Sequence, residues 1–447
     1  MENLDNLTEA LLSAAKKAGA DKADALAVSG RSLSIEVLSG ALEHAERSEG
    51  VDIGLRVLLG QRQACVSSSD IRADTIDEMA RRAVAMAREA PEDPFIGLAD
   101  PAQLSIVRDA SGLELFDPSA EPAPKDLEAD ALTAEAAALS VKGVAQVQGA
   151  SAGYSSHAIH LATSNGFTGG YTRTGRSISA VAISGEGLSM ERDYCGESRV
   201  FQSDLPEADV VGRTAGERAV ERAGAVKPPT GAFPVLFDER ISSSLIGHLL
   251  AAINGGSIVR GSSWLRDSLG EQVLPDGITL SEDPTRKRIA GSRPFDGEGL
   301  PVTPRDIVAD GVLTGWTLDL ATAKQLGMSS TGNASRGTSA PPSPSSGNME
   351  LSQGLQSRED LIAEMGTGLI ITSMIGSSIN PTTGDYSRGA SGFWVKNGEI
   401  TGPVNECTVA GNLRDMLMTI RPANDARRHL SRLVPSLLVE GLTIAGA

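Results

Sequence analysis

The sequence predicts an α+β protein in which duplicated N-terminal subdomains, each a helix–meander–helix unit, precede a strand-rich C-terminal domain. Two observations predict this class. Amphipathic helical stretches twice enclose a series of short, strand-like segments, and most of the chain after residue 230 has strand character. The 49 glycines and the low aromatic content of 3% suit a sheet-rich protein with many turns. We place the three units at residues 1–110, 118–226 and 231–447.

The first subdomain begins with a helix over 4–18, where leucines form one apolar stripe. A second apolar stripe predicts a helix over 73–90. Between the helices, glycines and polar residues separate short segments that we expect to be strands: 33–39, 41–48, 51–60 and 62–69.

The second subdomain repeats this order after a connector, 91–124, in which prolines interrupt any regular element. Helices are expected over 125–140 and 206–223. The strands expected between them are 143–152, 157–164, 166–175, 177–185 and one near 190–202. Both subdomains contain an S-x-G turn, a strand, a glycine and another strand in that order, which indicates a duplication.

The C-terminal domain starts after KPPT, residues 227–230. A buried strand at 233–238 ends at Asp238, which we expect to be the N-cap of the helix that carries SLIGHLLAAINGGS. Further helices are predicted around 268 and at 358–366. The stretch 329–347 has low complexity and is expected to be mobile, either as a lid over a groove or as a long loop.

Composition argues against several classes of partner. A net charge of −17 disfavours nucleic acid and anionic membranes, because both are bound mainly through basic residues. No apolar run is long enough to span a bilayer, and the N-terminus lacks the order of a signal peptide. Three separated cysteines suggest no disulfide framework. A cytoplasmic location is therefore expected.

The sequence also lacks a recognisable catalytic motif. A helical zinc peptidase site needs two histidines on one face and a glutamate beside them, but no histidine here begins such a motif. His157 and His160 lie in a strand-like segment, so they should point to opposite faces. His248 has no second ligand within one helical turn. The G-x-S-x-G match at 149–153 lies in a strand-like segment and not at a strand–elbow–helix junction.

The densest polar cluster is TGDYSRGASGFWVKNGEI, residues 383–400. Asp385, Ser387 and Arg388 lie among glycines there, just before an aromatic strand and the Asn397-Gly398 turn. Glycine at this density permits close approach of another chain, so the segment could bind a peptide or a partner. The alternative is a glycine-rich hairpin in which Asp385 and Arg388 form a structural pair. The sequence leaves both interpretations open.

Several ordered segments resemble the TldD/PmbA family along essentially the whole chain: GHLLAAINGGSIVRGSSWL, SRPFDGEGLPVTPRDIVADGVLTGW, EMGTGLIIT and TGDYSRGASGFWVKNGEITGPVNECTVAGNL. The family has two branches. TldD-type chains carry an H-E-x-x-x-H helix and bind zinc, whereas PmbA-type chains, also called TldE, do not. The resemblance implies a heteromeric metallopeptidase that admits unfolded peptides to an enclosed cavity and acts in peptide maturation and proteolysis. It also brings an older description of the family as modulators of DNA gyrase.

When the chain is aligned on Arg260, the resemblance places Gly247, His248 and Ala252 at the positions of the first zinc histidine, the catalytic glutamate and the second histidine. We call these the degenerate metal-site positions. Their identities assign the chain to the PmbA branch and imply that it has no catalytic residue, metal or cofactor of its own. Zinc is then expected in a TldD-type partner.

The resemblance further implies that this chain contacts a TldD-type catalytic subunit and unfolded peptides, and a homodimer is possible. Candidate contacts to peptide or partner are Gly255, Gly256, Asp385, Ser387, Arg388, Gly389 and Gly392. The alternative is that these residues only pack the domain. Two rival functions stay open: a homo-oligomeric peptide-binding or chaperone-like protein, and a metallopeptidase with unrecognised ligands.

Overall fold

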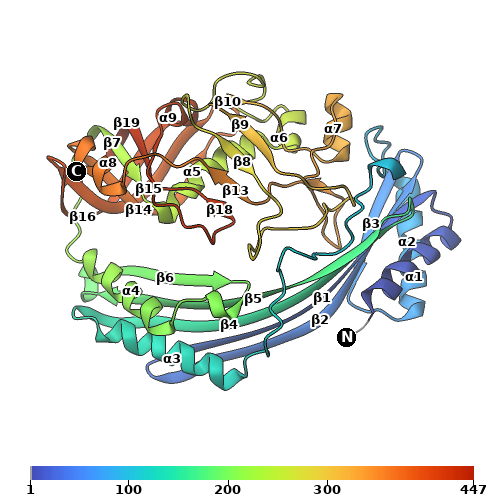
Figure 1. The fold of residues 1–447 in the computed structure, drawn as a ribbon, viewed down its shortest axis with the longest axis horizontal. Coiled ribbons are helices and arrows are strands. Elements are labelled where there is room, and N and C mark those ends of the chain that lie inside the picture. Colours follow the sequence, from blue (N-terminus) through green and yellow to red (C-terminus); the bar gives the residue numbers. More distant parts are fainter. Residues whose placement is uncertain (1–2) are drawn as a thin grey trace.

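The computed structural model describes residues 3–447 and contains two bodies that face each other (Figure 1). A long curved sheet forms the N-terminal body, and the C-terminal body lies against its concave side. The elements of the N-terminal body are α1 (Leu4–Ala18), β1 (Lys22–Leu38), β2 (Ala41–Leu59), β3 (Arg62–Ser68), α2 (Ala73–Glu89), α3 (Pro124–Ser140), β4 (Val144–Thr163), β5 (Thr168–Ser184), β6 (Glu191–Arg199) and α4 (Ala208–Glu221).

The predicted helix–meander–helix units are present, but they share one antiparallel sheet. Its strand order is β3-β2-β1-β4-β5-β6, so the first strand of one unit pairs with the first strand of the other. Each unit keeps its own helices: α1 and α2 cover one end of the sheet, and α3 and α4 cover the other. An apolar core lies under each helix pair, and the core under α3 and α4 also includes Leu33, Ile35 and Val37 of β1. The arrangement has the symmetry that a duplication would produce.

Several strand predictions are wrong in length. The segments predicted as separate strands at 41–48 and 51–60 are one strand, β2, and the predicted pairs in the second unit merge into β4 and β5 in the same way. Residues 22–32, which were assigned to no element, belong to β1. The polar stretches that suggested breaks, such as 48–50, stay extended because β1 pairs with their backbone, although their side chains are exposed.

The C-terminal body consists of many short strands and a few helices. Its elements are β7 (Gly231–Phe237), α5 (Glu239–Ala252), α6 (Gly255–Val259), β8 (Leu280–Glu282), β9 (Arg305–Ala309), β10 (Val312–Leu313), α7 (Leu320–Leu326), β11 (Ala334–Ser335), β12 (Ser343–Pro344), β13 (Met349–Leu351), α8 (Arg358–Met365), β14 (Gly368–Ile379), β15 (Asp385–Lys396), β16 (Glu399–Asn412), α9 (Leu413–Leu417), β17 (Arg421–Pro422), β18 (Arg432–Leu433) and β19 (Leu437–Ala445).

Five of these strands close into a barrel. The sheet order β16-β15-β14-β7-β19 is completed by a further pairing between β16 and β19. A second sheet, β10-β9-β8-β13-β18, packs beside the barrel, and the largest apolar core lies among the barrel, this sheet and α5. Closure pairs the two end strands with each other, through residues 408–410 of β16 and 443–445 of β19. No helix among residues 3–447 is both long enough and apolar enough to cross a membrane.

Two further predictions for this body need correction. No helix forms around residue 268, where turns lead to Gly270 with a positive φ of 85°. The stretch 329–347, which we expected to be mobile, is held in place by specific contacts. Strands β11 and β12 pair within it, and Arg336 forms a buried ion pair with Asp24 of β1 at 3.0 Å. A Cβ on Gly54 of β2 would lie 2.2 Å from the Thr338 carbonyl oxygen, so this segment is seated directly on the N-terminal sheet.

Candidate functional site

Helix α5 carries the degenerate metal-site positions. As predicted, Asp238 caps it: its carboxylate accepts a hydrogen bond from the Arg240 backbone N–H at 3.2 Å. Leu245, Ile246 and Leu249 follow at helical spacing and are fully buried in the core. The helix ends at Ala252, and Asn254 then caps α6 by accepting from the Gly256 N–H at 2.9 Å. The INGG sequence is therefore a helix–helix junction.

The residues at the degenerate positions do not suit a zinc ion. Gly247 and Ala252 have no donor atom in their side chains, so His248 is the only ligand that the three positions offer. The His248 ring packs edge-on against Tyr386, with ring centroids 5.8 Å apart, and its buried Nε2 atom has no hydrogen-bond partner. Among residues 3–447, no cluster of three or more histidines, cysteines or carboxylates is arranged to hold a metal.

Electrostatics disfavour a cation at His248 for a second reason. Burial lowers the pKa of the imidazole, and the nearby positive charge of Arg388 lowers this pKa further. The ring is therefore neutral at neutral pH, and a cation bound to it would be repelled by Arg388. Cys407 offers no substitute: it is buried, burial raises the pKa of its thiol, and its Sγ donates to the Ala390 carbonyl at 3.2 Å.

A cleft of about 640 Å³ opens beside α5, between the two bodies of the molecule. Residues from β6, from the C-terminal end of α4, and from α5, β14 and β15 surround it. They are dominated by arginines and hydroxyl groups: Arg192, Arg222, Arg240, Ser243, Ser244, Thr372, Ser373, Arg388 and Ser391, with Glu191 as the carboxylate of the lining. Such a lining favours anionic ligands.

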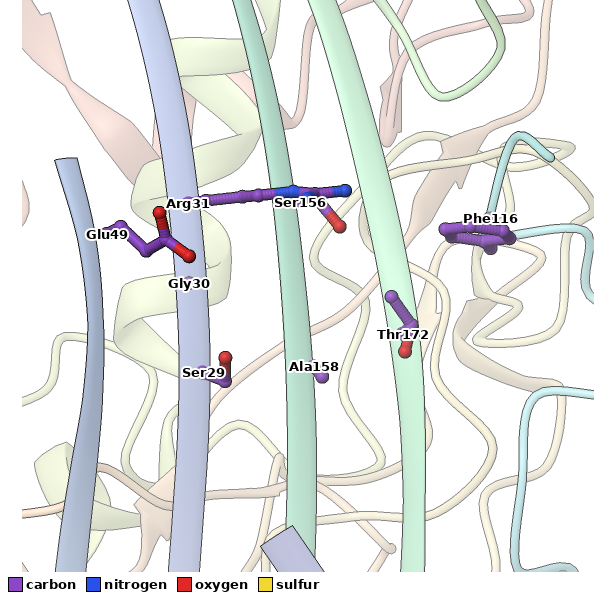
Figure 2. A pocket seen from close by; sticks show the side chains of 8 residues that line it. All are labelled: Ser29, Gly30, Arg31, Glu49, Phe116, Ser156, Ala158 and Thr172. Carbon is purple, nitrogen blue, oxygen red and sulfur yellow. The ribbon is translucent and has the colours of Figure 1, made fainter. Parts of the chain in front are cut away.

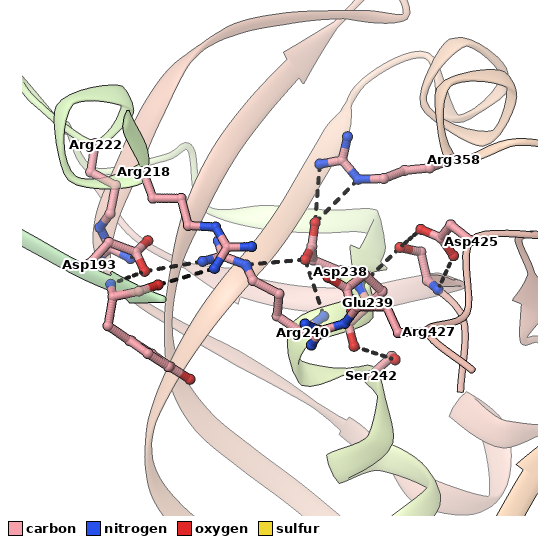
Figure 3. A network of polar contacts seen from close by, with 12 residues as sticks. Asp193, Arg218, Arg222, Asp238, Glu239, Arg240, Ser242, Arg358, Asp425 and Arg427 are labelled. Carbon is pink, nitrogen blue, oxygen red and sulfur yellow. Dashed lines mark hydrogen bonds and ion pairs between the residues drawn. The ribbon is translucent and has the colours of Figure 1, made fainter. Parts of the chain in front are cut away.

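A network of ion pairs holds the two bodies together at this cleft (Figure 3). Arg240 of α5 pairs with Asp193 of β6 at 3.1 Å, and Arg222 pairs with the same carboxylate at 3.6 Å. Asp238 in turn accepts from Arg358 of α8 at 3.2 Å. These charges are largely buried, and the Arg240–Asp193 pair joins the C-terminal body to the N-terminal body, while the other two pairs hold its partners in place.

The candidate contact residues do not form one groove. Arg388 lines the cleft beside α5, whereas Gly256 lines a separate cavity of about 480 Å³ with Arg56 and Glu298. Asp385 is exposed and accepts a hydrogen bond from Thr383 at 2.6 Å. It does not pair with Arg388, whose Nε donates to the Gly376 carbonyl at 2.7 Å, so the structural pair considered in the sequence analysis does not form.

For the glycines among these candidates, local packing explains the small residue at two positions. A Cβ on Gly392 would lie 1.9 Å from the Ile370 carbonyl oxygen, and one on Gly255 would lie 2.7 Å from Thr322 Oγ1. Gly389 and Ser387 lie on β15 in pairing with β14, and a Cβ on Gly389 would come within 3.3 Å of the Ile375 carbonyl oxygen. Gly255 and Gly392 thus have a structural reason to be glycine whether or not they contact a peptide.

A second pocket lies on the N-terminal sheet, where Figure 2 shows side chains from β1, β2, β4 and β5 and Phe116 from the connector. Its volume is about 200 Å³, and Arg31 extends across the strands toward Ser156. The Arg31 guanidinium is already paired with Glu121 at 3.0 Å. This pocket therefore offers little unpaired charge.

Sequence reasoning missed most residues of the cleft. Arg192, Arg222 and Arg240 stand in unrelated segments, and none belongs to a motif. Thr372 ends the EMGTGLIIT segment, but nothing in that segment marks it as a cleft residue. Sequence reasoning also missed a buried acidic pair, in which burial raises the pKa of Asp296 to about 6 and, together with the Asp296 charge, raises the pKa of Glu298 well above its usual value. The run PFDGEG carries no local signal that its carboxylates are buried.

Comparison with known proteins agrees with this architecture. Signatures described as PmbA/TldA metallopeptidase domain 1, central domain and C-terminal domain match residues 23–87, 117–223 and 230–446. The chain belongs to the PmbA/TldD metallopeptidase family. The metalloprotease PmbA of Escherichia coli O157:H7 is 38% identical over 419 residues, which cover 93% of this chain and 90% of that one.

Solved structures share the same fold. A protein of Bacteroides thetaiotaomicron described as a candidate modulator of DNA gyrase superposes with a TM-score of 0.92, at 27% identity and full coverage of both chains. TldE of Thermococcus kodakarensis superposes with a TM-score of 0.84 over 98% of this chain and all of that one; at 20% identity this likeness concerns the fold alone. Within the family, the chain is a member of the PmbA branch.

Proposed function

We propose that this chain is the non-catalytic, PmbA/TldE-type subunit of a two-component zinc metallopeptidase whose TldD-type subunit cuts unfolded peptides during proteolysis and peptide maturation. The observation that carries the proposal is the donor set of α5: Gly247 and Ala252 supply no ligand, and His248 is neutral with Arg388 nearby. Metal-assisted hydrolysis needs an ion that polarises the carbonyl and activates water. The residues at the degenerate positions cannot hold one.

In this proposal the chain contributes binding surfaces and charged side chains to the complex. The cleft beside α5 and the long exposed sheet give it surfaces on which a peptide or a second subunit can lie. In this proposal the TldD-type subunit holds the zinc and this chain completes the chamber. A description as a modulator of DNA gyrase then fits an indirect effect through proteolysis, since a net charge of −17 disfavours direct contact with DNA.

Co-purification tests the proposal. Tagged chain, expressed in its own host, is expected to capture a chain bearing H-E-x-x-x-H, and peptidase activity on an unfolded peptide should appear only when both are present. Replacing the glutamate of the partner's motif by glutamine should abolish activity. His248→Ala in this chain should leave the complex nearly as active as the parent, because His248 is not a ligand.

Three results would contradict the proposal. Failure to capture such a chain would favour the homo-oligomeric peptide-binding alternative. Peptidase activity of this chain alone, with stoichiometric zinc that survives His248→Ala, would indicate a metallopeptidase with other ligands. A loss of activity by orders of magnitude in the His248→Ala complex, with assembly intact, would show that His248 takes part in catalysis.

A further inference from the structure

The cleft beside α5 has more positive charge than its own carboxylates balance. Arg222 and Arg240 are compensated, since Glu191 and Asp193 lie within 3.6 Å of Arg222, and Asp193 and Asp238 lie within 3.4 Å of Arg240. Arg192 and Arg388 are not compensated: no carboxylate among residues 3–447 lies within 4.0 Å of either guanidinium. Arg192 donates to the Gln148 amide oxygen at 3.2 Å, and Arg388 donates to the Gly376 carbonyl at 2.7 Å; both of these acceptors are uncharged.

A buried hydroxyl in the same cleft lacks a partner. Thr372 of β14 is 6% exposed, and its Oγ1 makes no hydrogen bond with any described residue. Buried polar side chains nearly always have a partner. The Thr372 Oγ1 atom is shielded from solvent in this structure, so the cleft wall is polar at this point but offers a ligand no exposed hydroxyl.

The rim of the cleft is apolar. Met190, Tyr194 and Ile375 are 49%, 56% and 78% exposed, although residues of this kind are usually covered. One strand edge is also open here. On the side away from β15, β7 pairs with β14 only through Leu369–Ile371, and among the described residues no strand pairs with 372–375 on that side.

We infer that this cleft binds the C-terminal residue of an extended peptide, with its carboxylate attracted to the uncompensated guanidinium groups of Arg192 and Arg388 and its side chain against Met190, Tyr194 and Ile375. Guanidinium groups bind carboxylates through charge-assisted hydrogen bonds. The apolar rim selects a C-terminal residue with an apolar side chain. A free phosphate ion would leave this rim uncovered, which is why we choose a peptide terminus as the occupant.

This inference rests on the proposed function, because it names part of what a peptide-processing complex would recognise. It places a recognition site in a chain that cannot cut. Such a site would hold a substrate by its C-terminal end while the catalytic subunit acts at a distance along the peptide. The choice of substrate would then depend mainly on the chemistry of the peptide's C-terminus and little on the internal sequence of the peptide.

The test uses the purified full-length chain and two N-terminally fluorescein-labelled hexapeptides, Ser-Thr-Ala-Ser-Ala-Leu with a free carboxylate and the same peptide as the C-terminal amide. Fluorescence anisotropy should show that the acid binds at least tenfold more tightly than the amide. Arg192→Gln and Arg388→Gln should each weaken acid binding about tenfold and leave amide binding unchanged. Arg213→Gln, which removes an exposed arginine of α4 outside the cleft, is the matched control and should change neither.

The melting temperature guards against variants that merely fail to fold. Arg192 and Arg388 pair with no carboxylate among residues 3–447, so Arg192→Gln and Arg388→Gln should leave the melting temperature nearly unchanged while acid binding weakens. Equal affinity for acid and amide, or acid binding that survives the Arg192→Gln/Arg388→Gln double substitution, would overturn the inference. Co-purification of the catalytic subunit is a separate measurement. If the catalytic subunit co-purifies but the chain binds acid and amide equally, only this inference fails. If the catalytic subunit does not co-purify but the chain prefers the acid, only the proposed function fails.

Discussion

Gly392→Ala probes the closest backbone approach at any of the candidate contact residues. Gly392 is buried on β15, and the added Cβ would lie 1.9 Å from the Ile370 carbonyl oxygen and 3.0 Å from the Ile371 Cα. Real Cβ contacts essentially never fall below 3.0 Å, so β14 must move by about 1 Å or more at this point. Ile370 is fully buried and also pairs with β7, so β14 cannot shift without disturbing the barrel on its other side.

The expected cost follows from two contributions. Overpacking a tightly filled site costs about 1–3 kcal/mol. Displacing β14 also weakens about two ladder hydrogen bonds, at about 1 kcal/mol each. Together these predict a loss of about 3–5 kcal/mol in the free energy of unfolding of the C-terminal body. Gly392→Val should cost more, because its second branch meets the same backbone.

Urea unfolding followed by tryptophan fluorescence measures this loss selectively, because all three tryptophans, Trp264, Trp316 and Trp394, lie in the C-terminal body. Gly402→Ala is the matched control: Gly402 lies opposite Trp394 on β16, and its Cβ would meet nothing within 4 Å. That variant should be unchanged or up to about 1 kcal/mol more stable. A Gly392→Ala midpoint equal to that of the parent would refute the packing argument.

Three further predictions concern buried charge. Burial raises the pKa of Asp296 to about 6 and raises the pKa of Glu298 well above its usual value, so the folded state holds protons that the unfolded state releases. This contribution to stability is complete below the usual carboxyl pKa of about 4 and is lost as pH rises through the raised pKa values, which for Asp296 is about 6. Glu298→Gln should therefore narrow the fall in melting temperature between pH 5 and pH 8, and an unchanged fall would count against a charged pair. Asp193→Asn removes a carboxylate that pairs with Arg222 and Arg240, and it should lower the free energy of unfolding by about 3 kcal/mol, measured by thermal unfolding. The surface variant Asp209→Asn is the control and should cost less than about 0.5 kcal/mol. Equal costs would contradict the bridging role of the network. The lowered pKa of His248 acts in the opposite direction, since its contribution is present above about pH 6.5 and is lost as pH falls. His248→Phe keeps an aromatic ring against Tyr386, so it should change the free energy of unfolding by less than about 1 kcal/mol at pH 8. At pH 5 the variant should be more stable than the parent. A variant that is less stable at both pH values would show that the imidazole makes a contact we have not recognised.

Local patterns predicted the helices of the N-terminal body well, because each buries one face at a spacing that the sequence displays. The helix at 4–18 coincides with α1, and that at 73–90 extends one residue beyond α2. The strands were harder. A segment such as 41–50 is exposed along its whole length, so no alternation marks it, and its extended conformation depends on pairing with β1. The same holds for the closing contact between β16 and β19.

The candidate site, like the fold, could be predicted only in part from the sequence. The chemistry of the degenerate positions could be predicted because glycine and alanine have no donor atom in any conformation. Gly255 and Gly392 were predicted as candidate contacts to a peptide or partner, but only the structure shows that Thr322 and Ile370 of this chain lie against them. The expected Asp385–Arg388 pair failed because Arg388 bonds to the backbone of β14 instead.

The sequence by itself determined the family, the Asp238 cap of α5 and the absence of ligands at Gly247 and Ala252, since these depend on which residue stands at which position. Only the tertiary structure decided that two duplicated units share one sheet, that five strands close a barrel, and that Arg192, Thr372 and Arg388 meet in one cleft. The physical reason is that side-chain chemistry is local. The meeting of distant side chains depends on strand order and register, which are set by packing of the whole chain.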